Sequence, residues 1–168
     1  MPHTRPTTDV AKEGLFNVIE NNLDIPSLKC LDLFGGTGSI SYELASRGCS
    51  DITIVEKDPA MFEFIKKTAD QLALKQVHVV RLEVFKYLAT CQEKFDFIFA
   101  GPPYALGTID ELPLVIFQRH LLNPGGWFVL EHTPRNNYEK SEHYATHRSY
   151  GTTIFTIFIN RIPKQNEQ

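Results

Sequence analysis

The sequence lacks the features of membrane and secreted proteins. No stretch approaches the roughly 18 consecutive apolar residues that a membrane-spanning helix needs. The opening segment, Met-Pro-His-Thr-Arg-Pro, lacks the apolar core of a secretion signal. We therefore expect a cytoplasmic protein that makes no contact with a membrane.

Cysteine is also scarce, and metal-ligand spacings are missing. Cys30, Cys49 and Cys91 are odd in number and widely spaced, which favours neither a disulfide framework nor a zinc site. His143 and His147 lie four residues apart, as two ligands on one helix face would, but no third ligand follows them. We predict no bound metal ion.

Positive charge is not in excess. The formal net charge is -3 at pH 7 and the isoelectric point is near 6.1. Non-specific nucleic acid binding relies on a broad basic surface that neutralises phosphates, so this class of function is disfavoured. A local basic patch stays open: Arg5, Lys12, Arg135 and Arg148 either line an RNA entrance or are ordinary surface residues.

What is present is typical of one globular domain. The 168 residues are 42% hydrophobic and 22% charged, so one compact core is expected and disorder is not. We find no internal repeat or linker. We predict a single domain over residues 1–168, a flexible tail only at 162–168, and a monomer.

The apolar residues fall into short continuous runs that alternate with segments of helical period. Such runs are typical of strands buried on both faces of a parallel sheet. Two strands over residues 144–160, joined near Tyr150 and Gly151, have no helix between them and indicate an antiparallel hairpin. We predict an α/β fold with a mostly parallel, seven-stranded sheet and helices on both faces. The other strands are expected at 28–34, 52–56, 77–82, 95–100 and 127–131, and the helices at 9–22, 39–47, 59–72, 84–91 and 109–122, with a break at 123–126.

Three features fall where these strands end. Ligands of open parallel sheets bind outside the carboxyl ends of the strands. The first predicted strand runs into Asp-Leu-Phe-Gly-Gly-Thr-Gly (32–38), whose glycines let the backbone approach a ligand. Glu56 ends the second strand, where a carboxylate can bind both hydroxyls of a ribose, and Glu83 ends the third, where it can accept a hydrogen bond from an adenine amine. Together these features predict an adenosine site.

Two other interpretations of the glycine-rich turn remain. The glycines of such turns often serve only to reverse the chain. A dinucleotide dehydrogenase uses the same layout, but its fingerprint requires a third glycine at the position of Ser41, where the helix packs closely on the strand.

The most specific signal follows the fourth strand, where the chain reads Gly101-Pro102-Pro103-Tyr104. This segment resembles the Asn/Asp-Pro-Pro-Tyr/Phe motif of methyltransferases that act on amino groups of planar substrates. In that motif the first side chain and a proline carbonyl accept hydrogen bonds from the amine, and the aromatic ring stacks on the base. Catalysis of this kind is mostly positioning. The alternative is a rigid turn closed by a packed tyrosine.

Nearly the whole chain resembles the bacterial family of 16S ribosomal RNA guanine-N2 methyltransferases. The motifs occur in family order. They are Arg5-Pro6-Thr7-Thr8-Asp9, Lys12-Glu13, Leu15-Phe16-Asn17, residues 31–38, Ser46-Arg47-Gly48, Val55-Glu56-Lys57-Asp58 and Tyr150-Gly151.

The resemblance implies the Rossmann-like class I methyltransferase fold and S-adenosylmethionine as methyl donor, with S-adenosylhomocysteine as product. It also implies a guanine of 16S rRNA, or of the small ribosomal subunit, as acceptor. Gly101, Pro102, Pro103 and Tyr104 are then the expected catalytic residues. The expected cofactor residues are Asp32, Phe34, Gly35, Gly36, Thr37, Gly38, Glu56, Lys57, Glu83 and Val84, and the expected substrate residues are Arg5, Pro6, Thr7, Thr8 and Lys12.

The chain departs from the family at two places. Position 101 is glycine where the family has aspartate, so a side-chain acceptor for the guanine amine is missing. A hydrogen bond to a charged acceptor contributes about 1.5 to 3 kcal/mol, and its loss predicts a roughly ten- to hundredfold slower transfer. The family's basic N-terminal β-hairpin is absent from this sequence, and we therefore expect weak RNA affinity.

These departures leave other functions open. Gly101 suggests a catalytically silent S-adenosylmethionine-binding protein that contacts RNA or the ribosome. Methylation of a DNA adenine or a protein glutamine shares the Pro-Pro-aromatic turn. The lack of a target-recognition domain disfavours DNA as the substrate, and Arg5-Pro6-Thr7 favours the ribosomal family.

Overall fold

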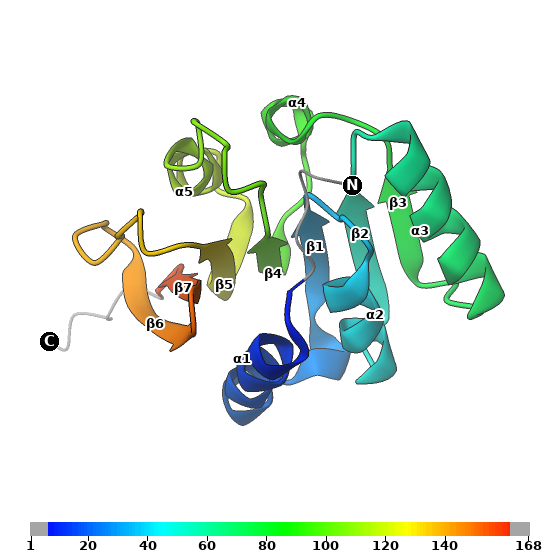
Figure 1. Ribbon diagram of the computed structural model, residues 1–168, viewed down its shortest axis with the longest axis horizontal. Coiled ribbons are helices and arrows are strands. Elements are labelled where there is room, and N and C mark those ends of the chain that lie inside the picture. The colour runs from blue at the N-terminus through cyan, green and yellow to red at the C-terminus, as the bar shows by residue number, and fades with distance from the viewer. Residues whose placement is uncertain (1–6, 162–168) are drawn as a thin grey trace, which may run out of the picture.

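The seven predicted strands form one sheet in the computed structural model, which describes residues 7–161. The strand order is β3-β2-β1-β4-β5-β7-β6, and only β7 runs antiparallel to the rest. Figure 1 shows the chain moving outward from β1 to β3 and then crossing to β4. The strands are β1 (Lys29–Leu33), β2 (Asp51–Val55), β3 (Val77–Val80), β4 (Phe95–Ala100), β5 (Leu122–His132), β6 (Tyr144–Tyr150) and β7 (Thr153–Ile159).

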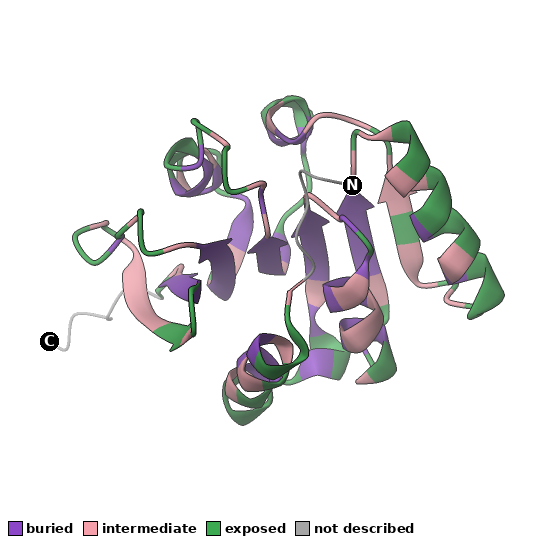
Figure 2. Ribbon diagram, in the orientation of Figure 1, coloured by how far each residue is buried: buried purple, intermediate pink, exposed green. Residues whose placement is uncertain are grey.

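Helices cover both faces of the sheet, each with its own hydrophobic cluster. One cluster joins the strands to α1 (Asp9–Asn22), α2 (Ser39–Ser46) and α3 (Pro59–Gln71). The other joins them to α4 (Val84–Thr90) and α5 (Glu111–Gln118). A short 3-10 helix, η1 (Ile25–Ser27), leads into β1. The central strands are accordingly buried along most of their length (Figure 2), and this confirms the predicted α/β fold with helices on both sides.

The sheet register brings the ends of three strands together. Leu33 at the end of β1 pairs with Ala100 at the end of β4, and Ala100 pairs in turn with Leu130 of β5. The backbone N–H of Gly101 donates to the carbonyl of Leu33 at 3.4 Å. Because β1 and β4 are the strands between which the chain reverses direction across the sheet, this edge is where a ligand site is expected.

The predicted break at 123–126 is wrong, because these residues belong to β5. Leu122 already pairs with Phe95, and the ladder then passes through a bulge before Trp127 pairs with Phe97. Gly125 adopts a left-handed φ of 81° and donates its N–H to the carbonyl of Asn160. Residues 123–126 resemble a turn in the sequence alone, but pairing with β4 and the hydrogen bond to Asn160 keep them in the sheet. The predicted helix at 109–122 is correspondingly shorter.

The ends of β3 and α3 also differ from the prediction, whereas the bounds of α1 agree with it. The third strand ends at Val80 and not at 82, because Glu83 is the N-cap of α4. The helix predicted over 59–72 ends at Gln71, and Leu72, which follows it as the C-cap, is 56% exposed. Gly14 lies within an uninterrupted α1, where it faces the ring of Tyr150. Among the described residues, no helix is long and apolar enough to cross a bilayer.

Candidate active site

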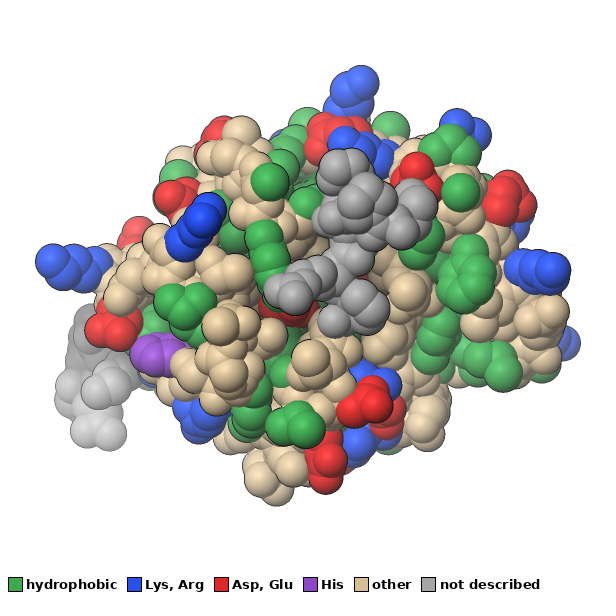
Figure 3. All heavy atoms as spheres, in the orientation of Figure 1, with side chains coloured by type: hydrophobic (Ala, Val, Ile, Leu, Met, Phe, Trp, Pro, Cys, Tyr) green, Lys and Arg blue, Asp and Glu red, His purple; other side chains and the backbone are tan. Residues whose placement is uncertain are grey.

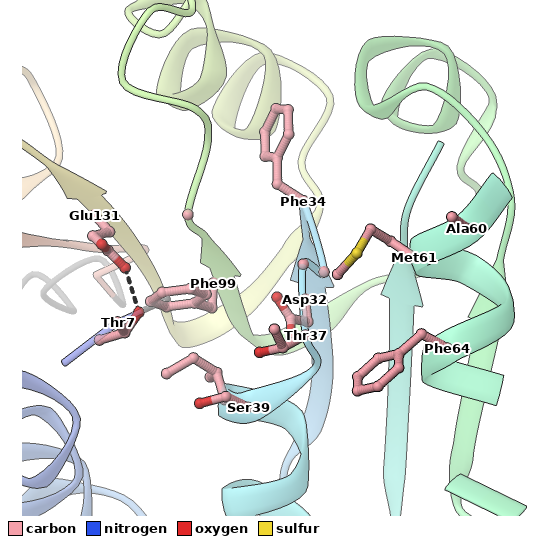
Figure 4. A pocket seen from close by; sticks show the side chains of 14 residues that line it. Thr7, Asp32, Phe34, Thr37, Ser39, Ala60, Met61, Phe64, Phe99 and Glu131 are labelled. Carbon is pink, nitrogen blue, oxygen red and sulfur yellow. Dashed lines mark hydrogen bonds between the residues drawn. The ribbon is translucent and has the colours of Figure 1, made fainter. Parts of the chain in front are cut away.

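A cavity of about 560 Å³ opens at the carboxyl ends of β1, β4 and β5. This size is within the range of small-molecule sites. Figure 4 shows Thr7 and Glu131 on one side, Met61 and Phe64 of α3 on the other, and Asp32 and Thr37 between them. The lining residues are Thr7, Asp32, Phe34, Gly35, Gly36, Thr37, Ser39, Ile40, Ala60, Met61, Phe64, Phe99, Gly101 and Glu131.

The glycine-rich turn forms the floor of this cavity at a position with no room for side chains. A Cβ added to Gly35 would lie 2.3 Å from Cγ2 of Ile54, a buried residue of β2. Phe34 has a positive φ of 60°, which is strained for a residue with a side chain. Only a sharp turn of this kind brings the backbone of residues 35–37 directly against the cavity.

Glu56 is held at the back of the turn by two backbone groups. Its Oε1 accepts from Gly36 N–H at 3.0 Å and its Oε2 accepts from Asp58 N–H at 2.9 Å. A carboxylate offers roughly four acceptor positions, so each oxygen retains one for another donor. This geometry suits the pair of ribose hydroxyls that the sequence predicts there, although Glu56 itself is not among the lining residues.

Asp32 is the most deeply buried acid of the site. Its side chain is 2% exposed, and its Oδ2 accepts from the hydroxyl of Ser41 at 2.6 Å. Burial raises the pKa of Asp32 to about 7, although the Ser41 hydrogen bond opposes this shift. A dinucleotide-binding fingerprint would have glycine at position 41. Here Ser41 donates a hydrogen bond to the Asp32 carboxylate instead.

Glu131 was missed by the sequence analysis, which only expected it to end a strand. It is 5% exposed, lines the cavity from β5, and accepts from the Thr7 hydroxyl at 2.7 Å through Oε1. Burial raises the pKa of Glu131, while hydrogen bonds from Thr7 and Tyr104 act in the opposite direction. The only signal in the sequence was an acid at the end of a core strand, directly after four apolar residues.

The Gly-Pro-Pro-Tyr segment leaves β4 beside this acid. Gly101 lines the cavity, Pro102 is buried, and Tyr104 is 39% exposed on the turn that follows. The structure thus places Gly101 at the cavity wall and leaves much of the Tyr104 side chain accessible to solvent. A planar group can reach its ring from outside.

The other predicted site residues are arranged as follows. Thr7 lines the cavity, whereas Thr8 accepts from Ala11 N–H at 3.2 Å as the N-cap of α1. Lys12 forms an ion pair with Glu43, with 3.8 Å between Nζ and Oε1. Arg5 and Pro6 lie outside the described residues.

Glu83 and Val84 are used by α4 itself. The oxygens of Glu83 accept from the backbone N–H groups of Phe85 and Lys86, at 2.7 and 3.2 Å. Val84 is buried in the hydrophobic cluster beneath α4. Neither lines the cavity within the described part of the chain, and the same is true of Gly38, Lys57, Pro102, Pro103 and Tyr104.

The histidines expected not to bind metal contact other rings. The ring of His143 stacks on Phe117 at 3.9 Å between centroids, and Nδ1 of His147 lies 2.6 Å from the hydroxyl of Tyr144. Between residues 7 and 161, no group of three or more metal-ligating side chains occurs. On the face shown in Figure 3, lysine and arginine side chains lie scattered around the rim, without a continuous basic stripe among the coloured atoms.

A family model described as "Conserved hypothetical protein 95" matches residues 1–159. The ribosomal RNA small subunit methyltransferase D of Buchnera aphidicola subsp. Baizongia pistaciae is 30% identical over 164 residues, which are 93% of this chain and 81% of that protein. The chain belongs to this family of ribosomal RNA small subunit methyltransferases D. The family that the motifs resemble is thereby confirmed.

Two solved structures support the same fold. A putative methyltransferase, yhhF, of Escherichia coli superposes with a TM-score of 0.83 at 23% identity, over 94% of this chain and 87% of that one. A T. thermophilus 16S rRNA N2 methyltransferase, in complex with AdoMet and guanosine, superposes with a TM-score of 0.72 at 24% identity, over 94% of this chain and 45% of that one. The methyltransferase D family therefore shares the Rossmann-like methyltransferase fold with these proteins.

Proposed function

We propose that this member of the methyltransferase D family transfers a methyl group from S-adenosylmethionine to the exocyclic N2 amine of a guanine in 16S ribosomal RNA. The observation that carries the proposal is the position of the cavity. It joins the glycine-rich turn after β1 to Gly101, the first residue of the Gly-Pro-Pro-Tyr segment after β4, within one space. A donor site and an amine-acceptor site must meet in this way for direct transfer.

The residues present fit the methyl donor. Glu56, fixed by two backbone N–H groups, would accept from its ribose, and the Gly35–Gly36 backbone would lie beneath its methionine portion. Met61 and Phe64 offer an apolar wall on the α3 side (Figure 4). The donor, when bound, supplies an electrophilic methyl group on a sulfonium centre.

The remaining task of the protein is to present the acceptor nitrogen. A base in a folded RNA must leave its stack before its amine can enter a cavity. Tyr104 is partly exposed on the turn after Gly101, and such a base would stack on its ring. The carbonyl of Pro102 then remains as a backbone acceptor at this turn. No covalent enzyme intermediate is needed.

Single-turnover transfer of labelled methyl to unmethylated small ribosomal subunits tests the proposal, with the chain compared to its Gly101→Asp variant. Signal on a guanine N2 with the unchanged chain is the expected result. Signal with Gly101→Asp alone would identify a silenced enzyme. No signal in either, with S-adenosylhomocysteine still binding in calorimetry, would mean another acceptor.

A further inference from the structure

Gly101 leaves an open position between the cavity and β5. A Cβ built on Gly101 would lie 3.5 Å from Oε1 of Glu131 and 3.2 Å from the ring of Phe99. The Glu131 carboxylate therefore borders the space that a side chain at position 101 would fill. Glu131 of β5 thus brings a carboxylate to the place where the motif has glycine in place of an acid.

The Glu131 side chain is held in place and still has acceptor capacity. Thr7 donates to Oε1 at 2.7 Å, and Tyr104 of the Gly-Pro-Pro-Tyr segment is a second hydrogen-bond partner. A carboxylate has roughly four acceptor positions, so two donors do not saturate it. Figure 4 shows the Glu131 oxygens directed from β5 toward Thr7, beside Phe99.

A buried carboxylate with spare acceptor positions is costly to the fold. Buried acids normally satisfy their oxygens with donors, because an ion in a poorly solvated place loses hydration. An exocyclic amine has two N–H donors and matches this deficit. A bound substrate would therefore supply the hydrogen-bond donors that the buried carboxylate lacks.

We propose that the Glu131 carboxylate accepts a hydrogen bond from the exocyclic amine of the methyl acceptor, in place of the side chain that position 101 lacks. This inference rests on the proposed function and adds the residue that selects the amine. Glu131 orients the nitrogen, and Thr7 and Tyr104 hold Glu131.

A comparison of guanosine with inosine isolates this contact, because inosine differs by lacking the exocyclic amine. Titration of each nucleoside into the protein saturated with S-adenosylhomocysteine measures their relative affinity without any turnover. We expect the unchanged chain to prefer guanosine by roughly ten- to hundredfold, the range for a hydrogen bond to a charged group. Glu131→Gln should bring the two affinities close together.

Methyl transfer supplies the second readout and a rescue. Glu131→Gln should slow single-turnover transfer at least about tenfold, by the same hydrogen-bond range. Adding Gly101→Asp to Glu131→Gln should recover much of the loss, because it returns a carboxylate to the same wall. Gly101→Asp alone should gain little, because its carboxylate would adjoin that of Glu131. Glu139→Gln, the same change at an exposed acid, is the control.

The outcomes separate the two proposals. If the unchanged chain methylates guanine and Glu131→Gln keeps both the rate and the guanosine preference, Glu131 does not bind the amine. A rescue that fails in a double variant with normal thermal unfolding and S-adenosylhomocysteine affinity would also overturn the inference. If the unchanged chain transfers no methyl group to rRNA, the proposed function itself fails, and this inference fails with it.

Discussion

At the scale of the residue, Tyr104 combines exposure with attachment to the site. The residue is 39% exposed, yet its side chain is a hydrogen-bond partner of the buried Glu131. The ring and the hydroxyl therefore have separate tasks: the ring is open to a stacked base, and the hydroxyl holds an acid that lines the cavity. Substitutions that remove one or both can tell these tasks apart.

We predict that Tyr104→Ala lowers single-turnover methyl transfer far more than it lowers S-adenosylhomocysteine affinity. Stacking of a base on an aromatic ring contributes about 1 to 3 kcal/mol, which corresponds to a roughly 5- to 150-fold change in rate. Tyr104→Phe keeps the ring and should retain more activity than Tyr104→Ala. Equal losses of transfer and cofactor affinity in Tyr104→Ala would remove Tyr104 from the stacking role.

At the scale of the element, α1 is fixed to the sheet through a glycine. A Cβ on Gly14 would lie 2.2 to 2.3 Å from ring atoms of Tyr150 at the end of β6. Glycine normally weakens a helix interior, but here its missing side chain lets the helix and this ring approach each other. The glycine in the middle of this helix thus allows a packing contact between α1 and Tyr150.

We predict that Gly14→Ala lowers the free energy of unfolding by about 1 to 3 kcal/mol, as overpacking usually does. This runs against the gain of about 1 kcal/mol that alanine brings to a helix interior. Asn17→Ala, on the exposed side of α1, is the matched control and should be neutral or slightly stabilising. Urea titrations compare the three proteins. A Gly14→Ala protein as stable as Asn17→Ala would show that the contact with Tyr150 is not tight.

The elements that could be predicted are those with a strong local pattern. The buried runs of β1, β2 and β4 and the turn after β1 were all predicted near their observed positions. The start of β5 was not, because Gly125 is held by a hydrogen bond from its N–H to Asn160, a residue 35 positions away in sequence. Glu131 was missed for the same reason. Its relation to Thr7 and Gly101 exists only after β4 and β5 pair.

At the scale of the whole molecule, the strand order gathers acids around one cavity. Asp32 comes from β1, Glu131 from β5, and Glu56 follows β2 just behind the turn. Negative charge at this edge favours a cationic sulfonium ligand and opposes the phosphates of RNA. With a net charge of -3, the chain should recognise a single presented base rather than a long stretch of backbone.

This arrangement has a cost in stability that depends on pH. Burial raises the pKa of Asp32 from near 3.8 to about 7, so the folded state binds this proton more tightly than the unfolded state. The stabilisation is complete below about pH 4 and is lost as pH rises toward 7, by at most about 1.4 kcal/mol per pH unit. Urea unfolding of the ligand-free protein between pH 5 and 8 should therefore show falling stability. Asp32→Asn should flatten this slope, whereas Asp70→Asn at an exposed site of α3 should keep it. An unchanged slope in Asp32→Asn would mean that Asp32 is already ionised in the fold at pH 5.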